Sequence, residues 1–237
     1  GYAIMITLVL LPETDNIPLH AIDEWRSELP AADQKRIALM QGVPRQIEFV
    51  VTRKLLQTLA QQRLGISAEV VSVAGAAPTL LTADGRSMAC SIAHSHKAIL
   101  VAINTLGPIG VDIERHRPRS ITRVVQRYFW ADGQTYFANC AEDESTPWFY
   151  RQWCIREALV KHQGDGNLFA LLGKPLTLPP GTLGQISQSS TLTLGVISSE
   201  ESQPELLYCA LSQDSQWVFS PPNPELGLTA LTPVVSQ

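Results

Sequence analysis

The sequence of 237 residues is poor in cysteine, in charge and in long apolar runs. Its 4 cysteines include no Cys-x-x-Cys pair, and a disulfide framework would need denser cysteine in a shorter chain. We therefore expect buried thiols in a reducing cytoplasm. No apolar run reaches the roughly 18 residues needed to cross a bilayer, so we expect neither a membrane span nor a membrane partner.

Charged residues make up 17% of the chain, and the formal net charge is −4. This balance argues against a nucleic-acid binder. Hydrophobic residues at 45% exclude a mostly disordered, collagen-like or coiled-coil protein. The first residue is Gly1, and whether it and its neighbours are native is left open. The apolar run over residues 3–11 predicts a buried strand rather than a signal peptide.

Hydrophobic patterning predicts a mixture of helices and strands. Helices are expected after Asp33 as a possible N-cap, and over residues 46–64, 115–139 and 148–161. Strands are expected over residues 68–73, 98–103, 109–114, 171–178, 191–198, 205–211 and 216–219, with 98–103 and 109–114 forming a hairpin. Helices followed by strands occur on both sides of residue 108. The pattern predicts an α+β fold of two similar lobes, residues 1–108 and 109–219, and an extended tail over residues 220–237.

Two carboxylates lie two residues apart in the strand Gly110-Val-Asp112-Ile-Glu114. Residues i and i+2 of a strand point to the same side, so Asp112 and Glu114 form an acidic pair that a cation would stabilise. Oxygen ligands of this kind suit Mg²⁺ better than Zn²⁺. The simpler interpretation is a strand end with two solvated acids.

A third acid lies on the helix Trp153-Cys-Ile-Arg-Glu157-Ala-Leu-Val-Lys161. Glu157 and Lys161 are four residues apart and are therefore neighbours on the helix surface. On an exposed helix they would form an ordinary ion pair, but this helix is largely apolar and should be packed. A partly buried Glu157 could complete a site begun by Asp112 and Glu114.

Histidine, serine and arginine side chains are candidates for binding phosphates. His94 and Ser95 offer hydrogen-bond donors in the segment 91–96, whereas zinc binding by its two histidines lacks further ligands. Five arginines from Arg115 to Arg127 form a cluster without an acid. Such a cluster suits an acidic protein surface or phosphates, or it is a solvated helix face.

The strand 110–114 and the helix 153–161, about 40 residues apart, resemble the two-part signature of the 4′-phosphopantetheinyl transferase superfamily. The segment containing His94 and Ser95 and the arginine-rich stretch over residues 33–56 are similar to further parts of that family. The resemblance covers residues 30–165, and the chain length resembles that of the larger, two-lobed members.

This resemblance implies two α+β lobes, each a small antiparallel sheet packed with helices, related by a pseudo-twofold axis with coenzyme A between them. It implies a monomeric enzyme that moves the 4′-phosphopantetheine group of coenzyme A onto a serine of an apo acyl or peptidyl carrier protein, releasing adenosine 3′,5′-bisphosphate. Fatty-acid, polyketide, peptide-synthetase and polyunsaturated-lipid pathways all stay open.

The resemblance also implies roles for individual residues. Asp112, Glu114 and Glu157 would hold Mg²⁺, and Lys161 would stabilise or protonate the departing phosphate. Glu157 or a metal-bound water would take the proton of the attacking serine. The acidic carrier protein would dock on the cluster Arg115–Arg127. Coenzyme A would be bound by Arg36, Arg45, Arg53, His94, Ser95 and Lys161.

Three departures from the family pattern leave other functions open. Arg156 replaces a lysine before the helix glutamate, residues 75–78 lack a phosphate-binding lysine, and Gln134 or Asp132 stands where many members have a glutamate. The same carboxylates could serve a Mg²⁺-dependent phosphoesterase or nuclease. Alternatively, the chain could bind carrier proteins without catalysing transfer.

Overall fold

The computed structural model describes residues 5–73, 76–118, 120–201 and 203–236. Its helices are α1 (Leu19–Glu28), α2 (Ala31–Leu39), α3 (Val43–Leu64), α4 (Ile121–Tyr128), α5 (Ala131–Asn139), α6 (Glu142–Gln163) and α7 (Leu168–Leu172), with short 3₁₀ helices η1 (Thr14–Asn16) and η2 (Pro224–Leu226). Its strands are β1 (Ile6–Leu11), β2 (Ala68–Val71), β3 (Thr79–Thr82), β4 (Ser87–Ser95), β5 (Ala98–Asn104), β6 (Gly110–Arg115), β7 (Thr182–Gln188), β8 (Leu192–Ser199), β9 (Glu205–Leu211), β10 (Trp217–Ser220) and β11 (Thr232–Val234). Within these ranges, every helix is too short or too polar to cross a bilayer.

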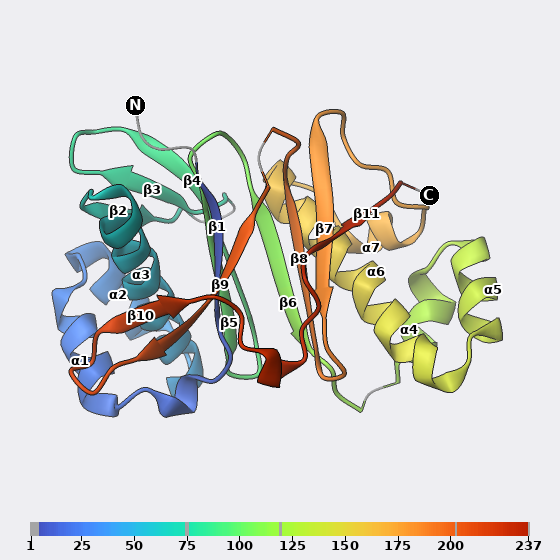
Figure 1. The fold of residues 1–237 in the computed structure, drawn as a ribbon, viewed down its shortest axis with the longest axis horizontal. Helices are drawn as coiled ribbons and strands as arrows, with labels where there is room; N and C mark the ends of the chain where they lie inside the picture. The colour runs from blue at the N-terminus through green and yellow to red at the C-terminus, as the bar shows by residue number, and fades with distance from the viewer. Residues whose placement is uncertain (1–4, 74–75, 119, 202, 237) are drawn as a thin grey trace.

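The strands form two sheets that share a buried core (Figure 1). The larger sheet has the strand order β10-β9-β1-β5-β4-β3-β2, and the smaller sheet has the order β11-β7-β8-β6. Helices α1 to α3 pack on the outer face of the larger sheet, and α6 packs on the outer face of the smaller one. The predicted α+β fold class is therefore confirmed.

The central strands β1 and β5 are apolar at nearly every position and are buried along their whole length. Such strands need a packed layer on each face. Because β1 and β4 occupy the two edges of β5, the predicted hairpin between residues 98–103 and 109–114 is wrong. The chain turns where the Asn104 side-chain amide donates to the Pro108 carbonyl oxygen at 3.0 Å, and β6 then enters the smaller sheet.

The chain returns to the larger sheet late in the sequence. β9 runs parallel to β1, with Leu10 opposite Tyr208, and β10 pairs antiparallel with β9. This parallel pair differs from the antiparallel sheets that were predicted, and it covers an edge of β1 that would otherwise be open to other chains. The lobe boundary at residue 108 stays a prediction, but these two strands, expected in the second lobe, lie in the first sheet.

Other differences from the sequence predictions are local. α2 begins after Pro30, so Asp33 lies buried in its first turn instead of capping it. The predicted strand over residues 171–178 is wrong: residues 171–172 end α7, which begins where the Asn167 side chain accepts a hydrogen bond from the Phe169 amide, and residues 173–178 contain no strand. In the tail, residues 232–234 pair with β7 as β11.

Candidate active site

The contact between β6 and α6 brings the acidic strand and the acidic helix together. Gly110 lies so close to α6 that a Cβ atom there would overlap the Ala158 carbonyl oxygen. Val111 and Ile113 point into the core between the sheets, so Gly110 and the two carboxylates of the motif face the helix. The glycine that opens the motif therefore lets α6 approach the strand.

Asp112 and Lys161 form the centre of the site. Lys161 Nζ lies 3.6 Å from Asp112 Oδ1 and donates a hydrogen bond to the Ile92 carbonyl oxygen at 3.2 Å. Asp112 is 6% exposed, and its buried Oδ2 has no hydrogen-bond partner among the described residues. Burial raises the pKa of Asp112 to about 7; Lys161 opposes this rise, while Glu114 and Glu157 add to it. Glu114 and Glu157 are thus each close enough to Asp112 to act on it electrostatically.

The chemistry of these donors fits a divalent cation, although no cluster is preformed. In the part of the chain that the structure describes, no three His, Cys, Asp or Glu side chains are already grouped to hold a metal. Asp112 nevertheless presents a buried carboxylate oxygen without a hydrogen bond, and two further carboxylates act on it electrostatically. A hard cation with oxygen ligands would satisfy that atom and relieve the repulsion.

Glu157 lies half-buried on α6 beside Lys161. Burial raises the pKa of Glu157, and the nearby Lys161 ammonium opposes the rise. The carboxylate is therefore a better proton acceptor than a fully solvated glutamate would be.

Two serines of β4 join the sheets next to the carboxylates. Ser91 Oγ accepts a hydrogen bond from the Val111 amide at 3.1 Å, and Ser95 Oγ accepts one from the Arg115 amide at 3.0 Å. The Ser95 hydroxyl also donates to Glu114 Oε2 at 3.4 Å. We did not predict these hydrogen bonds between β4 and β6. The sequence did indicate that Ser91 and Ser95, four residues apart, lie on the same face of a strand. Phosphate binding by Ser95 stays a prediction.

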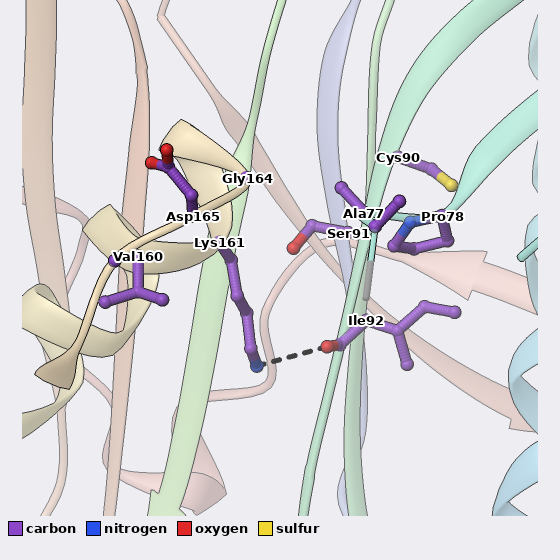
Figure 2. A pocket seen from close by; sticks show the side chains of 11 residues that line it. Ala77, Pro78, Cys90, Ser91, Ile92, Val160, Lys161, Gly164 and Asp165 are labelled. Atoms are coloured by element: carbon purple, nitrogen blue, oxygen red, sulfur yellow. Dashed lines mark hydrogen bonds between the residues drawn. The ribbon is translucent and has the colours of Figure 1, made fainter. Parts of the chain in front are cut away.

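A pocket of about 400 Å³ opens beside Lys161 (Figure 2). Its walls come from β4 at residues 90–92, from the end of α6 and the following turn at residues 164–166, and from residues 76–78. Figure 2 shows the Lys161 side chain extending from α6 toward the Ile92 carbonyl oxygen of β4. The wall at residues 76–78 is part of the segment 75–78, in which many family members have a phosphate-binding lysine. Its first residue, Gly75, lies outside the described residues.

The three arginines predicted to bind nucleotide phosphates differ in environment. Arg53 is 6% exposed, its guanidinium carbon lies 3.4 Å from the centre of the Phe49 ring, and Nη2 donates to Ser72 Oγ at 2.9 Å. Burial lowers the pKa of Arg53 to about 10. Arg36 lies over the same ring at 5.2 Å, whereas Arg45 is exposed near the start of α3. Arg53 thus has a packing role, and phosphate binding by all three stays a prediction.

His94 lies apart from the carboxylates, on the face of β4 that packs against α3. Its Nδ1 lies 3.2 Å from Oε2 of Glu48, a residue that we did not predict to take part. Phosphate binding by His94 stays a prediction.

Two of the departures from the family pattern have structural explanations. Arg156 is fully buried, donates to the carbonyl oxygens of Leu171 at 3.0 Å and Lys174 at 3.1 Å, and lies 4.7 Å from the centre of the Trp130 ring. It therefore joins α6 to α7 and to the segment that follows it. The Gln134 amide donates to the Phe129 carbonyl oxygen at 2.7 Å at the start of α5, which is a capping contact.

The arginine cluster divides into a structural member and exposed members. The Arg115 guanidinium donates to the Pro12 carbonyl oxygen at 2.8 Å and ties β6 to the end of β1. Arg123 and Arg127 are exposed on α4. Arg119 lies outside the described residues.

Comparison with known proteins identifies the family of the segment that carries this site. Residues 108–221 match the family model described as the 4′-phosphopantetheinyl transferase superfamily. This segment contains β6 and α6, with all three carboxylates and Lys161. The match covers 114 of the 237 residues and supports the family predicted from the sequence.

Individual relatives agree with this family. The chain is 32% identical over 76 residues to 4′-phosphopantetheinyl transferase Sfp of Bacillus subtilis (strain 168), covering 32% of this chain and 33% of that protein. It is 30% identical over 77 residues to 4′-phosphopantetheinyl transferase HetI of a Nostoc species, covering 32% of each. It is 29% identical over 107 residues to 4′-phosphopantetheinyl transferase AcpT of Salmonella typhi, covering 45% of this chain and 55% of that protein. The chain thus spans about a third of the length of the first two relatives.

Proposed function

We propose that this protein transfers the 4′-phosphopantetheine group of coenzyme A to a serine hydroxyl of an apo carrier protein and releases adenosine 3′,5′-bisphosphate. The observation that carries the proposal is the approach of Lys161 to the buried Asp112, at 3.6 Å, beside the 400 Å³ pocket and within the segment that matches the superfamily. A lysine beside clustered carboxylates suits a diphosphate held through a divalent cation.

Asp112, Glu114 and Glu157 would hold that cation, Mg²⁺. When bound, Mg²⁺ would neutralise part of the diphosphate charge and orient the reacting phosphate. The partnerless Oδ2 of Asp112 and the charges of Glu114 and Glu157 that act on Asp112 support this assignment. The oxygen-only donor set favours Mg²⁺ among the common divalent metals.

The residues of this chain supply proton transfer and charge stabilisation. The serine oxygen attacks the phosphorus that carries the pantetheine arm, and the bond from that phosphorus to the oxygen of the adenosine bisphosphate breaks. Glu157 takes the serine proton directly or through a water. Lys161 donates a hydrogen bond to the oxygen on which negative charge develops.

The two substrates approach from different parts of the surface. The pocket beside Lys161 takes one end of coenzyme A, because it borders both the lysine and β4. The carrier protein, which is acidic, docks on α4 through the exposed Arg123 and Arg127.

Mass spectrometry of an apo carrier protein incubated with this protein, coenzyme A and Mg²⁺ tests the proposal. We expect a mass gain of one phosphopantetheine. Glu157→Gln, which removes the charge at constant size, should abolish transfer. Glu142→Gln, at an exposed acid in the first turn of the same helix, should not.

The same experiment separates the alternatives. No gain with fatty-acid, polyketide and peptide-synthetase carriers would refute transfer. Complex formation without transfer would indicate a carrier-protein binder. Cleavage of a simple phosphodiester without coenzyme A would indicate a phosphoesterase.

A further inference from the structure

Glu48 and His94 form a pair outside the carboxylate cluster. Glu48 comes from α3 and His94 from β4, and Oε2 of the acid lies 3.2 Å from Nδ1 of the ring. The side chain of Glu48 is 19% exposed, whereas that of His94 is 53% exposed. The acid is therefore the enclosed member of the pair, and the imidazole is the member that a ligand can reach.

Glu48 is an acid in a stretch of sequence that is otherwise basic. It is the only acid in the sequence between Asp33 and Glu69, a stretch with six lysines and arginines. Its charge also acts on His96: burial and the nearby Arg117 and Arg115 lower the pKa of His96, and Glu48 opposes them. A single carboxylate in a cationic region weakens anion binding, unless it improves a neighbouring group that binds the anion.

The backbone holds the pair in place. Met88 and Cys90, on the same face of β4 as His94, lie in the core formed with the helices. His94 continues that row at the exposed end of the strand. Arg45 precedes Glu48 by about one turn of α3, so both side chains lie on neighbouring parts of one helix face. Glu48 is thus fixed to a long, well-packed helix.

We infer that Glu48 is a positioning residue that orients the His94 ring so that Nε2 binds a phosphate of coenzyme A. This inference rests on the proposed function. Because Nδ1 is occupied by Glu48, Nε2 is the ring nitrogen left for a ligand. A phosphate oxygen is an acceptor, so a ring that bridges Glu48 and a phosphate donates from both nitrogens, Nδ1–H to the carboxylate and Nε2–H to the phosphate. Carboxylates that stand behind metal-binding histidines orient the ring by a comparable hydrogen bond.

The ring itself gives a readout that does not depend on turnover. Nitrogen-15 NMR of the wild-type protein should show a proton on Nδ1 of His94. Glu48→Ala should move the neutral ring toward the Nε2–H form that an unpaired imidazole prefers. Glu48→Gln keeps an acceptor oxygen and should keep the proton on Nδ1, so this conservative variant rescues the signature.

Ligand binding gives the second readout, with adenosine 3′,5′-bisphosphate as the probe in isothermal titration calorimetry. Glu48→Ala should weaken binding about tenfold, as expected for the loss of a hydrogen bond to a charged group. Glu48→Gln should weaken it less. Glu28→Ala, which breaks the exposed 3.3 Å ion pair with Lys54 of α3, is the matched control and should have no effect. In a His94→Ala background, Glu48→Ala should add no further loss.

Two results would overturn the inference. One is an unchanged tautomer and an unchanged affinity in Glu48→Ala. The other is an equal loss of affinity with and without His94, because Glu48 would then act through another group. Failure of the proposed function would look different. The wild-type protein would modify no carrier and bind no adenosine bisphosphate, and this would also overturn the phosphate role of His94.

Discussion

The buried Asp112 should make the metal-free protein less stable as the pH rises. Burial raises the pKa of Asp112 from 3.8 to about 7. Between these values the folded protein binds a proton that the unfolded chain does not, so the free energy of unfolding falls with increasing pH. Each pKa unit corresponds to about 1.4 kcal/mol. Asp112→Asn removes the charge and should therefore stabilise the protein by about 2–4 kcal/mol at pH 8, and by much less at pH 4.

Urea unfolding, followed by tryptophan fluorescence at pH 4, 6 and 8 with EDTA present, measures this difference. Asp132→Asn, at an exposed acid on α5, is the control and should change the stability by less than about 0.5 kcal/mol at each pH. Adding Mg²⁺ at pH 8 should stabilise the wild-type protein and leave Asp112→Asn unchanged. A difference between Asp112→Asn and the wild type that is the same at pH 4 and pH 8 would refute the reasoning.

Three further predictions concern packing and docking. Gly110→Ala should cost at least about 3 kcal/mol of stability, because its Cβ would overlap the carbonyl oxygen of α6; a wild-type melting temperature in calorimetry would contradict this. Arg156→Met should cost about 3 kcal/mol in urea unfolding, because it removes the hydrogen bonds that the buried guanidinium donates to Leu171, Lys174 and Gln152, whereas unchanged stability would exclude its structural role. Arg123→Glu combined with Arg127→Glu should raise the KM for an acidic carrier at least about tenfold, less at high salt, without changing the KM for coenzyme A. An equal rise in both KM values would argue against docking on α4.

The acidic strand and the acidic helix could be predicted from the sequence because strands and helices each repeat over a few neighbouring residues. Asp112 and Glu114 share a face by the alternation of a strand, and Glu157 and Lys161 are neighbours by the turn of a helix. Their meeting was expected from the apolar character of the helix and from the family resemblance, but no local period requires it. In the structure it depends on Gly110, whose missing side chain has meaning only once α6 lies against it.

The errors arose where a distant partner decides the outcome. The strands 98–103 and 109–114 look like a hairpin locally, but β5 has both edges filled by strands from elsewhere. The burial of Arg53 and Arg156 could not be predicted either, because it depends on Phe49 and Trp130, whose aromatic faces lie against the guanidinium groups. Glu48 was missed because a lone acid in a basic stretch has no local pattern to mark it.

The pairing of β9 with β1 makes the two halves of the chain depend on each other for folding. The segment 108–221 that carries the family match contains β9 and β10, but the strand on which β9 docks lies near residue 10. Neither residues 1–108 nor the remainder alone holds every strand of the larger sheet. If the chain were divided between β5 and β6, the first part would keep the larger sheet without β9 and β10, and the second part would keep the β9–β10 hairpin without β1. We therefore expect both sheets to unfold in a single thermal transition.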